Sequence, residues 1–225
     1  MRVISWNLLR LEGAAVDDVA GLLERERPDL LLMQEVTQHM DRLPRQVPGH
    51  YHRLPWPGRI HGLAVWSRHN FSTPQVLPLP ASPLPGRLPR RRTQIVKVGD
   101  ITFANVHLSH GQLLNRRQLL RIAGALHGRP SAIIGDYNAV GPSLIPGFKD
   151  VGPREATHFA SNVVPFRLDR CLAHGLHCSL ASTLDFGPSD HKPIVLDLQV
   201  VEARVRRRPL MRARRRLVKI RAALR

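Results

Sequence analysis

Four short apolar runs in this chain each end in a cluster of polar residues, and a fifth cluster comes directly before another apolar run. Each run has the length of a buried strand, so each cluster is expected at the mouth of a strand. The fifth cluster contains Asp190 and His191, and Pro193 rules out a helical continuation into the run that follows. Polar residues gathered at strand ends are typical of an active site on a β scaffold. The other clusters are Ser5-Trp6-Asn7, Gln34-Glu35, Asn105-Val106-His107 and Gly135-Asp136-Tyr137-Asn138.

The remaining pattern predicts a mixed α and β class, and 225 residues are enough to bury one sizeable core. Residues 14–26 and 112–126 have the spacing of amphipathic helices, and 37–43 is a candidate short helix. The second helix is expected to bury Leu113, Leu119, Leu120, Ala123 and Leu126. A hairpin is expected to turn at Gly99-Asp100, and the proline-rich segment 74–89 is expected to be extended and exposed. Strands are expected at 1–7, 29–35, 62–67, 93–98, 101–107, 131–135, 167–173 and 193–201.

The formal charge is +17, and eleven Lys and Arg without an acid lie between residues 204 and 225. We therefore expect a folded domain over 1–201 and an Arg-rich tail over 202–225. A basic protein favours polyanions such as nucleic acid or an anionic membrane surface. The tail can form a cationic amphipathic helix, which either docks on the domain or contacts nucleic acid or anionic lipid. Its apolar stripe is Leu210, Ala213, Leu217, Ile220 and Leu224.

Other features of the sequence narrow the class of protein. Cys171 and Cys178 make neither a disulfide framework nor a zinc site, and we expect them to be small core residues. The chain shows no signal peptide and no transmembrane run, so we expect a soluble monomer, cytoplasmic if the source is a bacterium. Trp6 and Trp66 are expected in the core. The histidines outside the clusters, among them His39, His50, His52 and His127, are expected at the surface.

Residue chemistry leaves two interpretations open at each of the central clusters. Glu35 follows four apolar residues, and a partly buried carboxylate needs either a divalent cation or a nearby Arg. Asp136 and Asn138 stand two apart, so an extended backbone would direct both side chains to the same side. The alternative there is a solvated Asx turn. Asn7 is either a neutral oxygen donor beside Glu35 or a residue of a strand-end turn.

Taken in order, the clusters resemble the endonuclease/exonuclease/phosphatase superfamily over residues 1–199. Two more segments match it, Arg167-Leu168-Asp169-Arg170 and the core strand 61–68. The resemblance implies a four-layer α/β/β/α sandwich with two packed mixed β-sheets and an active site at one edge. The exonuclease III-like branch generally has Tyr where this chain has His107, so the resemblance is to the pancreatic deoxyribonuclease-like and phosphatase branches.

The resemblance also implies a role for each clustered residue. Glu35 would be the main ligand of Mg²⁺ or Mn²⁺, with Asn7 and Asp190 as further ligands. Asp136 would orient and deprotonate the attacking water. The phosphate and its transition state would be held by Asn138, His107 and His191, with Asp169 orienting the last of these.

The core motifs do not identify the substrate, so it has to be inferred from the loops and the charge of the chain. Three hypotheses remain open. The first is a DNA nuclease, either a 3′→5′ exonuclease or a weakly specific endonuclease that leaves a 5′-phosphate and a 3′-hydroxyl. The second is a hydrolase of phospholipid or inositol head groups, against which the lack of an aromatic membrane loop weighs. The third is a non-enzymatic nucleic-acid-binding protein, against which the complete catalytic set weighs. Residues expected to contact DNA are Arg68, Arg90, Arg91, Arg92, Arg116 and Arg117.

Overall fold

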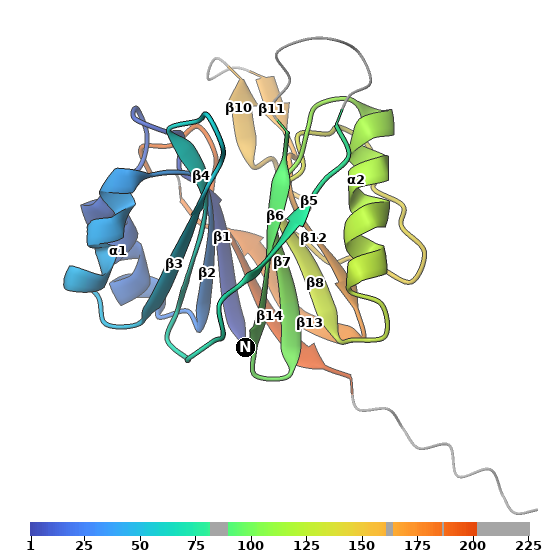
Figure 1. Ribbon diagram of the computed structural model, residues 1–225, viewed down its shortest axis with the longest axis horizontal. Helices are drawn as coiled ribbons and strands as arrows, with labels where there is room; N and C mark the ends of the chain where they lie inside the picture. Colours follow the sequence, from blue (N-terminus) through green and yellow to red (C-terminus); the bar gives the residue numbers. More distant parts are fainter. Residues whose placement is uncertain (82–89, 161–163, 186, 202–225) are drawn as a thin grey trace, which may run out of the picture.

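A computed structural model describes residues 1–81, 90–160, 164–185 and 187–201 (Figure 1). Its first sheet has the strand order β13-β14-β1-β2-β4-β3. These strands are β1 (Arg2–Asn7), β2 (Leu30–Thr37), β3 (His50–Pro55), β4 (His61–Ser67), β13 (Leu176–Thr183) and β14 (Ile194–Val200). The Arg-rich tail lies outside the described residues, so the expected division at residue 202 stays a prediction.

The second sheet has the order β5-β6-β7-β8-β12-β9. Its strands are β5 (Gln75–Pro78), β6 (Arg92–Val98), β7 (Ile101–His107), β8 (Ser131–Asp136), β9 (Lys149–Asp150) and β12 (Asp169–His174). A separate two-stranded hairpin consists of β10 (His158–Ala160) and β11 (Val164–Phe166). The helices are α1 (Val16–Glu26), α2 (Gln112–Ala125) and a 3-10 helix (Gln38–Arg45).

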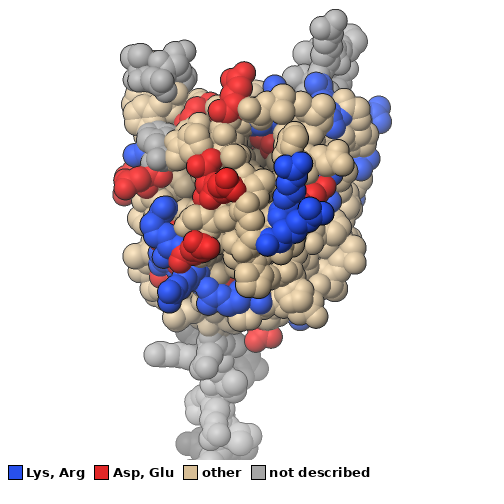
Figure 2. All heavy atoms as spheres, turned by 90° about the vertical axis from the view of Figure 1, so that its left-hand side faces the viewer, with Lys and Arg blue, Asp and Glu red and all other residues tan. Residues whose placement is uncertain are grey.

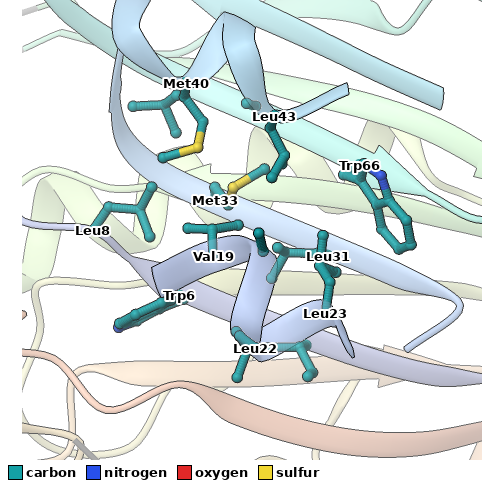
Figure 3. Packing of buried hydrophobic residues seen from close by; sticks show 14 of the residues in the cluster. Trp6, Leu8, Val19, Leu22, Leu23, Leu31, Met33, Met40, Leu43 and Trp66 are labelled. Carbon is teal, nitrogen blue, oxygen red and sulfur yellow. The ribbon is translucent and has the colours of Figure 1, made fainter. Parts of the chain in front are cut away.

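The two sheets pack face to face, with α1 outside the first sheet and α2 outside the second (Figure 1). Side chains alternate across each strand, so neighbouring residues enter different layers. Leu30 and Leu32 of β2 pack between the sheets against residues such as Phe103. Leu31 and Met33 point the other way, into the cluster beneath α1 (Figure 3). The expected four-layer α/β/β/α sandwich is thereby confirmed.

The outer face of the second sheet is covered by α2, and the buried face of this helix agrees only in part with the expected one. Leu119, Ile122 and Leu126 are buried, as are the polar side chains Asn115 and Gln118. The expectation that Leu113 and Leu120 are buried is wrong, because they are 83% and 43% exposed. Apolar spacing alone could not identify the buried face, since Asn115 and Gln118 satisfy their polar groups with hydrogen bonds to Ser109 and to the carbonyls of Tyr137 and Pro80.

The expected hairpin turn and the expected burial of the tryptophans and cysteines agree more closely with the structure. The hairpin between β6 and β7 turns at Gly99, whose φ of 56° suits glycine. Trp6 and Trp66 are buried, and Cys171 is a buried free thiol while Cys178 is half-buried. The proline-rich segment is extended at β5, although Leu77 and Leu79 are buried rather than exposed. Among the described residues, no helix is long and apolar enough to span a membrane.

Charges on the α1 side of the molecule are of both signs. Lys and Arg alternate with Asp and Glu over this face, without a large patch of one sign (Figure 2). Asp41 and Arg53 illustrate the pattern, with a bidentate ion pair of 2.8 and 2.9 Å. The described residues of this face therefore form no extended basic surface for a polyanion.

Candidate active site

Strand pairing brings the predicted site residues to one edge of the sandwich, the upper edge in Figure 1. In the first sheet β1 and β2 are parallel, so Asn7 is the partner of Gln34 and lies beside Glu35. In the second sheet β7 and β8 are parallel, and His107 is the partner of Asp136. Because carboxyl ends of parallel strands meet at the same edge, residues far apart in the sequence converge there.

The loop before β14 completes this edge. Ser189 donates a hydrogen bond of 2.6 Å to the carbonyl of Asn7, and the Trp6 indole donates one of 2.9 Å to the carbonyl of His191. These contacts fix Asp190 and His191 against the end of β1. In the other sheet, Asp169 opens β12 as the direct partner of Asp136.

Asp136 is the centre of the site and is 1% exposed. Its Oδ2 accepts hydrogen bonds from Asn7 Nδ2 at 3.0 Å and from Asn138 Nδ2 at 3.1 Å. Its Oδ1 accepts one of 2.8 Å from the Asn138 amide. Burial raises the pKa of Asp136 to about 6, although the charge of His191 acts in the opposite direction. The carboxyl is therefore mostly ionised at pH 7 and close to the pKa that suits a general base.

The backbone around Asp136 differs from the extended form considered from the sequence. Gly135 has φ of 141°, and a Cβ there would lie 2.1 Å from the carbonyl oxygen of Val106, so only glycine fits. Asn138 has φ of 49°, and its amide bond to Asp136 closes an Asx turn. The turn is buried rather than solvated, and it brings the two side chains together in spite of the non-extended backbone.

His191 and Asp169 form a buried dyad. His191 Nδ1 donates to Asp169 Oδ2 at 2.7 Å, while Nε2 lies 3.9 Å from Asp136 Oδ2. Burial by itself would lower the pKa of His191, but the carboxylates of Asp169 and Asp136 outweigh it and raise the pKa to about 10. His191 is therefore an imidazolium at pH 7, with Nε2–H directed toward the centre of the site.

His107, unlike His191, is an uncharged imidazole. Its Nε2 lies 3.5 Å from Asp136 Oδ2 and 3.9 Å from Glu35 Oε1. Burial, helped by the positive charge of Arg91, lowers the pKa of His107 well below its usual value. The ring is therefore neutral and offers a single N–H donor to a ligand.

Glu35 lies in a β-bulge of β2, with φ of 57°. Its Oε2 accepts from the Arg10 amide at 3.3 Å and lies 3.4 Å from Arg10 Nη1, so the arginine partner that the sequence left open is present. Oε1 lies 3.9 Å from His107 Nε2, beyond hydrogen-bond distance. The Asn7 oxygen accepts a 3.2 Å bond from the Leu9 amide.

These oxygen donors fit a hard divalent cation. Glu35 Oε1 is available, and Asp190 Oδ1 is buried without a hydrogen-bond partner among the described residues. The described residues also hold two groups of three His or Asp side chains that could ligate a cation. These groups are His158, Asp190 and His191, and Asp136, Asp169 and His191. Glu35 belongs to neither group, so its partnership with Asp190 remains a prediction.

The basic residues are distributed unequally around the site. Arg91 is 8% exposed, and its guanidinium lies 4.7 Å above the ring of Trp56. Arg90, Arg116 and Arg117 are exposed and Arg92 is half-buried, all in segments next to the site edge. Arg68 follows β4 at the opposite edge, where it donates to the Arg27 carbonyl at 2.7 Å. The structure thus places Arg68 away from the other basic residues.

Three aromatic side chains near the site were not anticipated from the sequence. Trp56 lies 5.5 Å from His107 and 5.3 Å from His61, measured between ring centroids. His158 lies 4.4 Å from His191. His158 is half-buried, so the expectation that unmatched histidines lie at the surface is wrong for it. His61, which opens the core strand that resembles the family, is 7% exposed. Both belong to hairpins whose position depends on tertiary pairing.

Comparison with solved structures agrees with this architecture. A protein of unknown function from Enterococcus faecalis V583 has a TM-score of 0.71 at 19% identity, over 89% of this chain and 100% of its own. An endonuclease/exonuclease/phosphatase from Bacteroides vulgatus has a TM-score of 0.70 at 17% identity, over 88% and 98%. D. rerio TDP2, complexed with a single-strand DNA product, has a TM-score of 0.69 at 15% identity, over 89% and 99%. At these identities the likeness shows a shared fold.

Sequence comparison gives the family. No curated protein matches the chain. A family model described as the Endonuclease/Exonuclease/phosphatase family matches residues 4–191, which include every residue of the predicted catalytic and metal set. Its members are generally phosphoester hydrolases that depend on divalent metal ions. The chain therefore belongs to the endonuclease/exonuclease/phosphatase family.

Proposed function

We propose that this protein is a divalent-metal-dependent nuclease that hydrolyses phosphodiester bonds of DNA, leaving a 5′-phosphate and a 3′-hydroxyl. One observation supports the hydrolytic part most strongly. Asp136 is a buried carboxylate held by two asparagines, and it faces both the imidazolium of His191 and the neutral ring of His107. This is a general base beside two donors for phosphate oxygens.

In this mechanism Asp136 accepts a proton from the attacking water and aims the oxygen at phosphorus. Asn7 and Asn138 hold the carboxylate in place through their Nδ2 groups. The Nε2–H of His191 and one N–H of His107 donate to the non-bridging oxygens as negative charge develops on them. When bound near Glu35, Asn7 and Asp190, a divalent cation would neutralise a non-bridging oxygen and the leaving oxygen.

Replacement of Asp169 by Asn tests the dyad. Without the Asp169 charge the pKa of His191 falls, since that charge is the largest influence raising it. The pKa of Asp136 also falls, because Asp169 raises it. We expect both limbs of the pH profile of kcat/KM to move to lower pH, and kcat at neutral pH to fall about tenfold or more. A variant that loses activity but keeps the wild-type pH profile would show that Asp169 has only a structural role.

Nucleic acid as the substrate is supported by the basic residues beside the site and by the fold shared with D. rerio TDP2, which was solved with a single-strand DNA product. Arg91 is the best-placed cation. Its pKa is lowered to about 10, chiefly by burial, so it stays charged, and its Nε is buried without a partner among the described residues. We propose that it holds a phosphate of the substrate.

Arg91→Ala is accordingly expected to raise KM for DNA about tenfold with a small change in kcat, the scale of one charge-assisted hydrogen bond. Arg91→Lys keeps the charge but loses the planar stacking on Trp56, and we expect partial recovery. Arg90→Ala removes an exposed neighbouring charge and is the matched control, with a smaller effect. Equal effects of Arg90→Ala and Arg91→Ala would contradict a specific role for Arg91.

The tail is proposed to add sequence-independent contacts with phosphates. Truncation after Glu202 removes eleven Lys and Arg residues. We expect weaker DNA binding and a shallower slope of log K against log salt, because fewer counterions are released, with turnover at saturating DNA preserved. An unchanged slope would mean that the tail does not contact DNA.

A second candidate, hydrolysis of a phospholipid head group, is favoured by one observation. Of the six described large apolar side chains that are more than half exposed, five lie on loops or at the start of α2 at the site edge, where Arg residues accompany them. Aliphatic side chains beside cations suit an anionic lipid surface better than a DNA backbone. These side chains are Leu11, Ile60, Leu113, Val140 and Leu144, at 72%, 59%, 83%, 58% and 71% exposure.

The two candidates are separated by parallel assays with Mg²⁺ or Mn²⁺. The substrates are linear duplex DNA, circular DNA, an abasic oligonucleotide and phosphoinositide vesicles. We expect release of 5′-phosphorylated products from linear DNA, and little hydrolysis of the phosphoinositide in the vesicles. Hydrolysis of phosphoinositide without cleavage of any DNA would overturn the nuclease proposal in favour of the second candidate. An inactive Asp136→Asn variant in the same assays excludes a contaminating nuclease.

A further inference from the structure

His158 lies against the catalytic dyad, but none of the steps described above uses it. Its ring stacks on that of His191, with centroids 4.4 Å apart and an interplanar angle of 39°. Its Nδ1 lies 3.6 Å from Asp190 Oδ2. Ligand atoms of His158, Asp190 and His191 all lie within 4.8 Å of one another. The three side chains therefore form a second polar cluster beside Asp136.

Two atoms of this cluster are buried without a hydrogen-bond partner in the described part of the chain, His158 Nδ1 and Asp190 Oδ1. The 3.6 Å between His158 and Asp190 is too long for a hydrogen bond. A buried polar atom without a partner costs about 1–3 kcal/mol. A cation bound between the imidazole nitrogen and the carboxylate would satisfy both groups.

The backbone holds the two groups in this position without any bound ligand. His158 and His191 form an antiparallel bridge between β10 and the loop before β14. On either side of it, the Phe159 amide donates to the Asp190 carbonyl at 3.3 Å, and the Lys192 amide donates to the Thr157 carbonyl at 2.7 Å. A preformed pair of ligands reduces the entropy lost when a cation binds.

Charge around the cluster also favours a cation. The carboxylates of Asp136, Asp169 and Asp190 surround the single positive charge of His191. The side chains of His158 and Asp190 are 16% and 32% exposed, so parts of both side chains reach solvent although His158 Nδ1 and Asp190 Oδ1 are buried.

We propose that His158 Nδ1 and the Asp190 carboxylate form a binding site for a borderline transition-metal ion such as Mn²⁺, Co²⁺ or Zn²⁺. The site would share Asp190 with the oxygen-donor site predicted around Glu35, and it differs from that site in its nitrogen ligand, His158. An imidazole ligand selects these ions over Mg²⁺, which takes oxygen donors. His191 lines the site but is not a ligand, because its Nδ1 is hydrogen-bonded to Asp169. The proposal concerns binding and stands whether or not the substrate is DNA.

The test is a titration of the full chain with Mn²⁺ in about a hundredfold excess of Mg²⁺, which fills sites made of oxygen donors alone. Free Mn²⁺ is measured by its EPR signal, and nitrogen coordination by electron spin echo envelope modulation. We expect the wild type to bind Mn²⁺ with nitrogen modulation. His158→Ala should lose the modulation and weaken binding about tenfold or more. Glu35→Gln should keep both.

The controls make each outcome decisive. His39→Ala removes an exposed histidine elsewhere and should change nothing. His158→Gln, which keeps a polar end beside Asp190, replaces His158→Ala if circular dichroism shows that the alanine variant is unfolded. The proposal is overturned if the wild type shows no nitrogen modulation. It is also overturned if the modulation survives loss of His158, in which case its disappearance in His191→Ala would identify His191 as the ligand.

Discussion

Chelation of divalent cations is expected to remove all measurable phosphodiester hydrolysis by this protein, and added Mg²⁺ or Mn²⁺ is expected to restore it. The predicted ligands Glu35, Asn7 and Asp190 supply carboxylate and amide oxygens, which bind these ions. Without a cation, the negative charge that develops on the phosphate would be met only by histidine and arginine donors. The measurement is turnover against free metal concentration in a metal buffer. Full turnover in excess chelator would contradict the metal assignment.

Glu35→Gln tests the same prediction at a single residue. We expect turnover to fall on the order of a hundredfold at limiting metal, with part of the loss recovered at high metal concentration. Folding should be preserved, because the contact of Glu35 with half-exposed Arg10 is a surface ion pair worth about 0–1 kcal/mol.

Arg10→Gln is the matched control for Glu35→Gln. It breaks the same ion pair from the other side and leaves the carboxylate in place. If Glu35 binds a cation, only Glu35→Gln becomes dependent on high metal concentration. If Glu35 serves only as the partner of Arg10, the two variants will behave alike in both turnover and metal dependence.

Asp136→Asn is expected to lower kcat by about a hundredfold or more, the usual effect of removing a general base. The substitution keeps the size of the side chain. It also turns an acceptor into a donor beside Asn7 and Asn138, both of which now donate to Asp136 Oδ2. Substrate Kd should change little, because Asp136 acts on the attacking water and carries no binding role. The measurement is single-turnover hydrolysis together with equilibrium binding.

Asp150→Asn is the control for the chemical change itself. Asp150 is a partly buried carboxylate with two 2.7 Å contacts to Arg167, outside the site. We expect this variant to lower the melting temperature and to keep kcat. Near-wild-type turnover in Asp136→Asn would show that another group is the base. If kcat falls in both variants in proportion to the drop in melting temperature, the loss of activity is due to destabilised folding.

Part of the site could be predicted because the relevant information is local. Apolar runs of strand length ending in polar residues predicted which side chains stand at strand ends, and Asn7, Asp136 and His107 are there. Parallel pairing of neighbouring strands, with the helices as crossovers, brings polar ends together within each sheet, and the packing of the two sheets joins Asn7 to Asp136. The pairing of His191 with Asp169, first implied by resemblance, is present at 2.7 Å.

Other features depended on packing that the sequence pattern does not contain. Leu113 and Leu120 have the spacing of a buried helical face, yet the neighbouring face with Asn115 and Gln118 packs on the sheet, because local partners satisfy those polar groups. Glu35 adopts a positive φ because β2 carries an extra residue against β4. Periodicity in a single strand cannot show where its neighbour forces a bulge.

The sequence by itself determined eight of the strands, among them those that end at the site, and the identity of the central carboxylates, because these follow from alternation along each strand and from local turn chemistry. It did not predict the strands β3, β9, β10, β11 and β13. Tertiary structure decided which other side chains surround the central carboxylates. The β3–β4 hairpin brings Trp56 under Arg91, and the β10–β11 hairpin places His158 on His191. The physical reason is that contacts between distant segments depend on how the sheets and hairpins pack, and no local pattern records that arrangement.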